Sequence, residues 1–130
     1  MRDLEEARIF FEKDRYAVGL TGAVIEDVKD GYAKVSVQIT DDHRGAHGQV
    51  MGGVLFTLAD LAFAAASNDE DHFTATASSN ISFITGAKGG KLTAESRLVR
   101  NGRRLCFAET EVRDESGEII ATVSVTGVHI

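Results

Sequence analysis

The sequence predicts a single α+β domain, spanning residues 1–130, in which a curved antiparallel sheet of five to six strands wraps one long helix. Three observations predict this fold. The chain has 130 residues, of which 43% are apolar, enough for one hydrophobic core and too few for two domains. Residues 52–66 are apolar on almost every side, so other elements must surround them. The second half of the chain alternates apolar and polar residues, which is typical of half-buried strands.

The first element is a short amphipathic helix from Asp3 to Asp14. Its apolar residues recur at spacings of three to four, and Asp3 with Glu6 resembles a capping box. We expect this helix to pack as a lid on the body of the domain. Two strands follow, at 21–28 and 32–39, and the turn residues between them predict a hairpin.

Residues 41–50 show no periodicity and predict a loop of about ten residues, longer than a plain connection needs. The long helix runs from Gly52 to about Ser67 and ends at a polar turn. In the next strand, Phe73, Ala75, Ala77, Ile81 and Phe83 alternate with polar residues. Three further strands are predicted at 91–100, 103–114 and 118–130, in one antiparallel series, with Asn101-Gly102 as a hairpin turn.

The composition excludes several classes of function. A formal net charge of -6 disfavours nucleic acid as a partner, because phosphate recognition needs clustered Lys and Arg. The longest apolar run, about 15 residues, is shorter than the roughly 20 that cross a bilayer. Neither a disulfide framework nor secretion is indicated, since Cys106 is the only cysteine and the given sequence opens with charged residues and no apolar h-region. We therefore expect a cytoplasmic protein that does not bind membranes.

Asp60 is the only ionisable residue of the apolar helix. At mid-helix neither capping nor the helix dipole favours a carboxylate, so Asp60 must find donors, shift its pKa or face a cavity. Counted from Asp60 in steps of three and four, the residues three, four and seven positions away form a stripe of small or polar side chains, which resembles a cleft wall: Gly53, Thr57, Ala64 and Ser67. The alternative is a structural Asp bonded to a neighbouring strand or across an interface.

Gly52 and Gly53 begin the same helix, where the first backbone amides have no helical acceptor and can polarise a carbonyl oxygen. Without a Cβ, the backbone can also approach a ligand closely. The alternative is a tight turn needed only for packing. No Lys-Ser or Lys-Thr follows, so a phosphate loop is not indicated.

The segment 48–62, GQVMGGVLFTLADLA, resembles the signature of hotdog-fold acyl-CoA thioesterases of the phenylacetyl-CoA (PaaI-like) type. That pattern runs Asn-Pro-x-Gly-x-x-His-Gly-Gly and continues into a helix with Leu-x-Asp near its middle. The resemblance covers most of the chain and implies the hotdog fold. It also implies that Asp60 is the catalytic nucleophile or base, and that the Gly52 amide binds the thioester oxygen.

The resemblance further implies an obligate homodimer, often paired again into a tetramer, with each site shared by two subunits. The family's water-positioning Ser or Thr falls at Thr76, which alternation places on one strand face with Ser78 and Asn80; an alignment shifted by two residues would put Ser78 in this role instead. Gly53 and Phe56 join these residues as expected substrate contacts. Phe56 and Phe63 either shape the acyl pocket or pack in the core.

Two residues depart from the family pattern. Met51 stands where the pattern has His, and Gly45 where it has Asn. Met51 cannot donate the hydrogen bond that an imidazole gives, so either backbone amides alone bind the oxyanion or His47 contributes from its loop. Removing one such donor typically costs about a hundred- to a thousandfold in rate.

The other candidate residues have stronger structural interpretations. Arg103, with its neighbours Arg100 and Arg104, either meets the phosphates of coenzyme A or forms a solvated hairpin tip. His43 and His47 are expected to be solvated, and a metal site with Asp41 and Asp42 has no matching ligand spacing. Cys106 lies between Leu105 and Phe107 and is expected to be buried and inert.

The leading hypothesis is therefore hydrolysis of an acyl-CoA, aromatic or of short to medium chain, to a carboxylic acid and coenzyme A, with no metal or redox cofactor. A non-catalytic acyl-CoA binding protein on the same fold is the main alternative. A hydratase or dehydratase is a weaker one, because only His47 could serve as its base and the neighbours of His47 do not resemble a hydratase motif. The sequence has no Gly-x-Ser-x-Gly elbow, which disfavours a serine hydrolase.

Overall fold

A computed structural model describes residues 3–130. Two helices and six strands follow in the order α1 (Leu4–Phe11), β1 (Val24–Lys29), β2 (Tyr32–Gln38), α2 (Gly52–Ser67), β3 (Thr74–Phe83), β4 (Lys91–Asn101), β5 (Leu105–Arg113) and β6 (Ile119–His129). Two short turns complete the chain, the π-helical η1 (Arg15–Leu20) and the 3₁₀ η2 (Asp41–His43). The predicted α+β architecture is confirmed, and α2 begins and ends where the sequence predicts.

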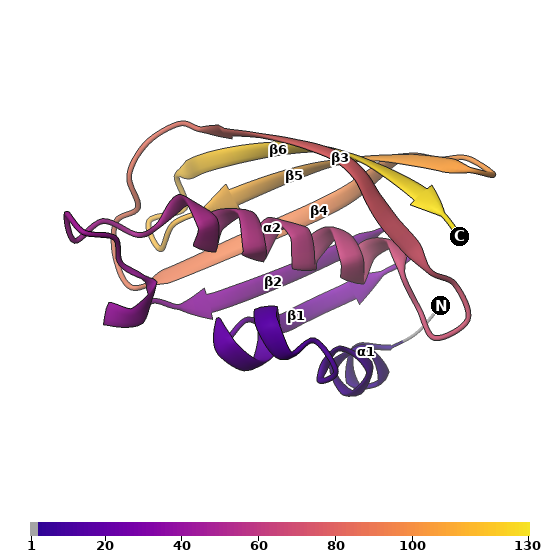
Figure 1. The fold of residues 1–130 in the computed structure, drawn as a ribbon, viewed down its shortest axis with the longest axis horizontal. Helices are drawn as coiled ribbons and strands as arrows, with labels where there is room; N and C mark the ends of the chain where they lie inside the picture. The colour runs from indigo at the N-terminus through magenta and orange to yellow at the C-terminus, as the bar shows by residue number, and fades with distance from the viewer. Residues whose placement is uncertain (1–2) are drawn as a thin grey trace.

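The six strands form one antiparallel sheet in the order β1-β2-β4-β5-β6-β3. Figure 1 shows α2 lying across one face of this sheet, with α1 beside β1. β3 pairs with β6 and not with β4, so the expected series of four strands is only partly right. β3 is an edge strand, and one side of its backbone has no partner within residues 3–130.

The core lies between α2 and the sheet. Leu58, Leu61 and Phe63 of α2 are at most 2% exposed and belong to one contiguous cluster of buried apolar residues. α2 contacts all six strands of the sheet and also η1, which explains why it is apolar nearly all round. Ala7 and Phe11 of α1 join the same cluster, so the first helix covers the edge of the core at β1, as a lid would.

The N-terminal helix is shorter than predicted. The Asp3 carboxylate caps α1 by accepting from the Glu6 N–H at 2.8 Å. The Asp14 carboxylate then accepts from the N–H groups of Tyr16 and Ala17 and starts η1, which delays β1 to Val24. Asp14 was predicted to end a helix and instead begins one.

Candidate active site

Asp60 lies at the middle of α2 and lines a pocket of about 400 Å³. Gly53, Thr57 and Ala64 of the predicted stripe line the same pocket. The fourth member, Ser67, lines a different pocket at the end of α2, and its hydroxyl donates to the carbonyl of Phe63. The stripe is thus one wall of a cleft, and the opposite wall is formed by the η1 segment, through Asp14, Tyr16 and Ala17.

The pKa of the Asp60 carboxyl is raised above its ordinary value. The main cause is loss of hydration: the residue is exposed, but the pocket walls keep part of the water from its carboxylate. The negative charge of Asp14 raises the pKa further, whereas a hydrogen bond from Thr76 lowers it. A carboxylate with a raised pKa holds a proton more readily, which favours its use as a base.

Thr76 is the strand residue that meets Asp60: its hydroxyl donates to Asp60 Oδ1 at 3.3 Å. Thr76 pairs with the buried Gly127, whereas Ser78 pairs with Thr126 across an irregularity at Ala77. This β-bulge shifts the alternation by one residue.

The prediction of which β3 residues face the core is therefore wrong for the first half of the strand. Ser78 and Asn80 lie on the outer face of the sheet and not beside Thr76, because the bulge inserts one residue between them. Likewise Phe73 is 59% exposed, while Thr74 is only 4% exposed and faces the core.

The Gly52 end of α2 lines a different pocket, of about 380 Å³. Met51 is the N-cap and makes no capping hydrogen bond with its side chain, so it leaves the first amides of the helix free of that partner. A Cβ on Gly52 would lie 3.0 Å from two atoms of the Phe83 ring, so the glycine lets this ring pack on the helix start.

Gly52 and Asp60 do not meet within one chain. They are eight residues apart on one helix, which separates them by about 12 Å along its axis. Gly53 shares the Asp60 pocket, but Gly52 does not. One thioester carbonyl could not contact both groups of a single chain, because reacting atoms must come within about 3–3.5 Å.

The two loop histidines differ. His43 is 8% exposed and not solvated as expected: its Nδ1 accepts from the Thr40 N–H and its Nε2 donates to the Thr21 carbonyl. With both nitrogens engaged, His43 cannot act as a metal ligand. His47 is exposed, as expected, and its backbone N–H donates to Gln49. Within residues 3–130 no group of three or more His, Cys, Asp or Glu could hold a metal ion.

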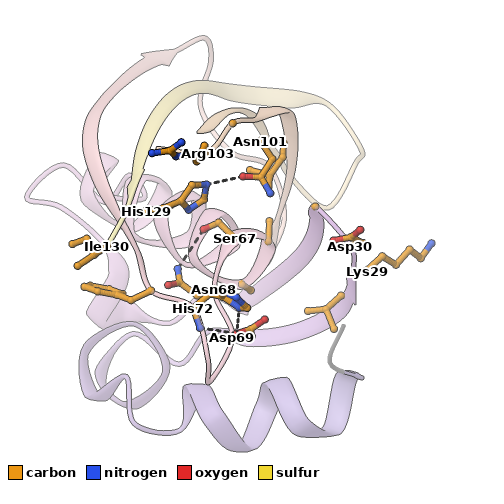
Figure 2. Close-up of a pocket in the computed structure, with 17 residues that line it drawn as sticks. Lys29, Asp30, Ser67, Asn68, Asp69, His72, Asn101, Arg103, His129 and Ile130 are labelled. Carbon is orange, nitrogen blue, oxygen red and sulfur yellow. Dashed lines mark hydrogen bonds and ion pairs between the residues drawn. The ribbon is translucent and has the colours of Figure 1, made fainter. Parts of the chain in front are cut away.

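Arg103 lies on the β4–β5 hairpin, at a third pocket of about 440 Å³ near the end of α2 (Figure 2). Its side chain is exposed, and no ion pair to it is found among residues 3–130. Beside it, His129 bridges Asn101 at 2.7 Å and Thr74 at 2.8 Å. This polar network fixes the ends of three strands, and it leaves Arg103 free to meet an anion.

The structure also places the two aromatic residues predicted for the pocket or the core, and the cysteine. Phe56 is half-buried and lines the Asp60 pocket, whereas Phe63 is 1% exposed and packs in the core. Cys106 is buried, and burial raises the pKa of its thiol, as expected for an inert residue.

Two parts of the site were not predicted from the sequence. Asp14 and Tyr16 reach the Asp60 pocket through η1, and a π-helical turn has no short-range sequence signature. Gln49 lines the Gly52 pocket. Its place three residues before the glycine pair was the only signal for it.

Comparison with known proteins adds to this geometry. The family model described as thioesterase superfamily matches residues 47–121. The acyl-coenzyme A thioesterase PaaI of Escherichia coli is 29% identical over 118 residues, which are 90% of this chain and 84% of the relative. A protein of Archaeoglobus fulgidus, named only provisionally as an esterase, is 32% identical over 124 residues, 95% of this chain and 80% of its own.

Solved structures show the same fold. A mutant of the phenylacetic acid degradation protein PaaI from Thermus thermophilus superposes with a TM-score of 0.79 at 28% identity, covering 94% of this chain and 99% of its own. The PaaI structure from Escherichia coli superposes with a TM-score of 0.87 at 23% identity, over 99% of this chain and 96% of its own.

Proposed function

Because the chain belongs to the thioesterase superfamily and is a thioester hydrolase, we propose that its substrate is an acyl-CoA, with an aromatic or a short to medium acyl chain. The likeness to an acyl-coenzyme A thioesterase over 90% of the chain supports this substrate class. The products are a carboxylic acid and free coenzyme A. The reaction as proposed uses no metal or redox cofactor.

The single observation that carries the proposal is Asp60. This residue of an otherwise apolar helix lines a pocket, and the pKa of its carboxyl is raised. As a base, Asp60 takes a proton from water while the water oxygen attacks the thioester carbon. As a nucleophile, its own oxygen attacks first and water hydrolyses the resulting anhydride. In both routes the C–S bond breaks and the sulfur leaves as the thiol of coenzyme A.

The amide of Gly52 is proposed to stabilise the negative charge that develops on the carbonyl oxygen. Since Gly52 and Asp60 of one chain are too far apart, two chains would complete each site, with the partner's Gly52 opposite Asp60. β3 supports a homodimer, because its ten residues present an unpaired backbone edge to which a second copy could add. Pairing of two such dimers into a tetramer is part of the same proposal.

Arg103 is proposed to bind the phosphates of coenzyme A, since it is an exposed cation beside a pocket on an acidic protein. We also propose a cytoplasmic location, because the only cysteine is buried and unpaired. In the described part of the chain no helix is both long and apolar enough to cross a membrane.

The direct test replaces Asp60 by Asn and follows thiol release from a panel of short, aromatic and long acyl-CoAs. Turnover should be lost. The fold should persist. Because folding raises the pKa of Asp60, the ionised carboxylate destabilises the folded chain relative to the unfolded one. This destabilisation is absent below the pKa that Asp60 has in the unfolded chain and complete above the pKa that it has in the folded chain. The variant should therefore be at least as stable as the wild type at pH 7. Full activity of this variant would refute the role of Asp60.

A complementation experiment tests the shared site. Asp60→Asn and Gly52→Pro each inactivate one half of it. Proline suits the first helical position and removes the N–H, and the exposed Phe83 ring, 3.0 Å from a Cβ at position 52, has room to shift by the few tenths of an ångström required. In an equal mixture that exchanges subunits, half of the dimers are hybrids with one intact site of two, so about a quarter of the activity should return. If both groups act within one chain, mixing restores nothing.

The non-catalytic acyl-CoA binding protein remains the second candidate, and Met51 is the observation that favours it. Met51 makes no capping hydrogen bond and cannot donate one to a substrate oxygen. Tight binding of acyl-CoA by the wild type, without release of free coenzyme A, would decide for this candidate.

A further inference from the structure

The segment before α2 is a small hairpin and not an irregular loop. Arg44 and Val50 form a β-bridge, and the Gly45 N–H donates to the Gln49 carbonyl at 2.7 Å. Gly48, with a φ of 84°, provides the turn. The hairpin therefore holds Gln49 at a defined point three residues before the start of α2.

The Gln49 carboxamide is oriented by its own hydrogen bond. Its Oε1 accepts from the His47 N–H at 3.1 Å, which assigns Nε2 to the other side of the group. No residue between 3 and 130 accepts a hydrogen bond from Nε2. The Gln49 side chain is exposed, so its Nε2 is open to solvent and can donate to a ligand that displaces the water.

Gly45 explains where this carboxamide lies. A Cβ built on Gly45 would lie 2.5 Å from Gln49 Nε2 and 3.0 Å from Gln49 Cδ, with Met51 Sδ at 2.9 Å. The carboxamide thus occupies the space that a side chain at position 45 would fill. Glycine at 45 and glutamine at 49 are complementary, since either a larger residue at 45 or the present Gln49 can occupy that volume.

Gln49 and Gly52 line the same pocket of about 380 Å³. From this shared pocket and the free Nε2 donor, we infer that Gln49 is a further catalytic residue, which donates to the thioester carbonyl oxygen beside the Gly52 amide. A backbone amide paired with a side-chain amide is an effective oxyanion site. Gln49 then supplies the donor that Met51 lacks. The inference rests on the proposed acyl-CoA hydrolysis.

The first test compares Gln49→Ala with Gln49→Glu, which keeps the shape of the side chain but removes the donor. Both should lower kcat by about a hundredfold with KM little changed, since the bond is made mainly in the transition state. A purely structural role would instead move KM and the thermal midpoint as well. Wild-type kcat in both variants would overturn the inference.

The second test is a rescue. Gly45→Asn combined with Gln49→Ala returns a carboxamide to the same space from position 45, and kcat should recover at least tenfold over Gln49→Ala. Gly45→Ala with Gln49→Ala is the matched control, which fills space without a donor and should recover nothing. Equal recovery in both double variants would show that only volume matters and would overturn the inference.

These outcomes separate the inference from the proposed function. If Asp60→Asn is inactive while both Gln49 variants are fully active, only the role of Gln49 fails. If the wild type releases no thiol from any acyl-CoA tested, the proposed function fails and this inference falls with it.

Discussion

Gly127 in β6 is the position at which one added methyl group should disturb the core and the site together. It pairs with Thr76 on one side and with Cys106 on the other. A Cβ on Gly127 would lie 2.6 Å from Phe63 Cζ, 2.8 Å from Cys106 Sγ and 2.9 Å from Thr74 Cγ2. Ordinary contacts begin at 3.4 Å, so the three neighbours fall short by 0.8, 0.6 and 0.5 Å.

No single side chain can relieve these contacts. The three neighbours belong to α2, β5 and β3 and are at most 4% exposed. Overpacking of this kind costs about 1–3 kcal/mol, and the upper end applies here. Gly→Ala replacement regains about 0.5–1 kcal/mol through the unfolded chain, which leaves Gly127→Ala destabilised by about 2 kcal/mol. For a chain of this length that corresponds to a thermal midpoint lower by about 8 °C.

The assay is thermal unfolding at matched protein concentration, with thiol release measured on the same samples. Gly19→Ala is the control, because its Cβ would meet nothing closer than 3.9 Å. Activity of Gly127→Ala should fall too, since a displaced β3 carries Thr76 away from Asp60. Adding Cys106→Ala should recover part of the stability by removing one contact. An unchanged midpoint and unchanged turnover in Gly127→Ala would refute the packing argument.

Three further predictions concern charge. Thr76→Val removes the hydrogen bond that lowers the pKa of Asp60, so the acid limb of the kcat/KM profile should move to higher pH, whereas Thr76→Ser should not move it; an unmoved limb in the valine variant would contradict the contact. The Ser116 hydroxyl and backbone donors lower the pKa of Asp114, so Asp114→Asn should destabilise the fold at pH 7, with the difference shrinking as pH falls from the unfolded value of about 3.9 through the lower folded pKa. A difference measured by urea unfolding that stays constant down to pH 2 would speak against this. Arg103→Ser should raise KM for acyl-CoA but not for the matching pantetheine thioester, and equal effects on both would rule out a phosphate contact.

The sequence predicts the elements well where periodicity is unbroken. The bounds of α2 follow from an apolar run that ends in a polar turn, and the β1–β2 hairpin follows from Asp30 and Gly31. Strand order is harder to predict, because β3 pairs with β6, which is far away in the sequence, and no local pattern encodes such a pairing.

The site could be predicted from the sequence where the chemistry of a residue conflicts with that of its neighbours. Asp60 could be found because a carboxylate in an apolar helix needs a reason. His43 was misjudged because its burial depends on Thr21, which lies 22 residues away in the sequence and accepts from Nε2 only after folding. Likewise, Ala75 and Ala77 are small enough for either face of β3, so the alternation could not reveal the bulge.

That extra residue at Ala77 has a consequence for transferring roles between homologues. A gapless alignment with a relative that lacks the insertion will match the correct side chain on one half of β3 and its neighbour on the other. In such an alignment, one column would contain residues that face the core in one protein and residues that face outward in another, so conservation scores along this strand would be misleading. Superposed backbones, compared from Gly127 outward, give the safer guide to equivalence for any enzyme engineered from this scaffold.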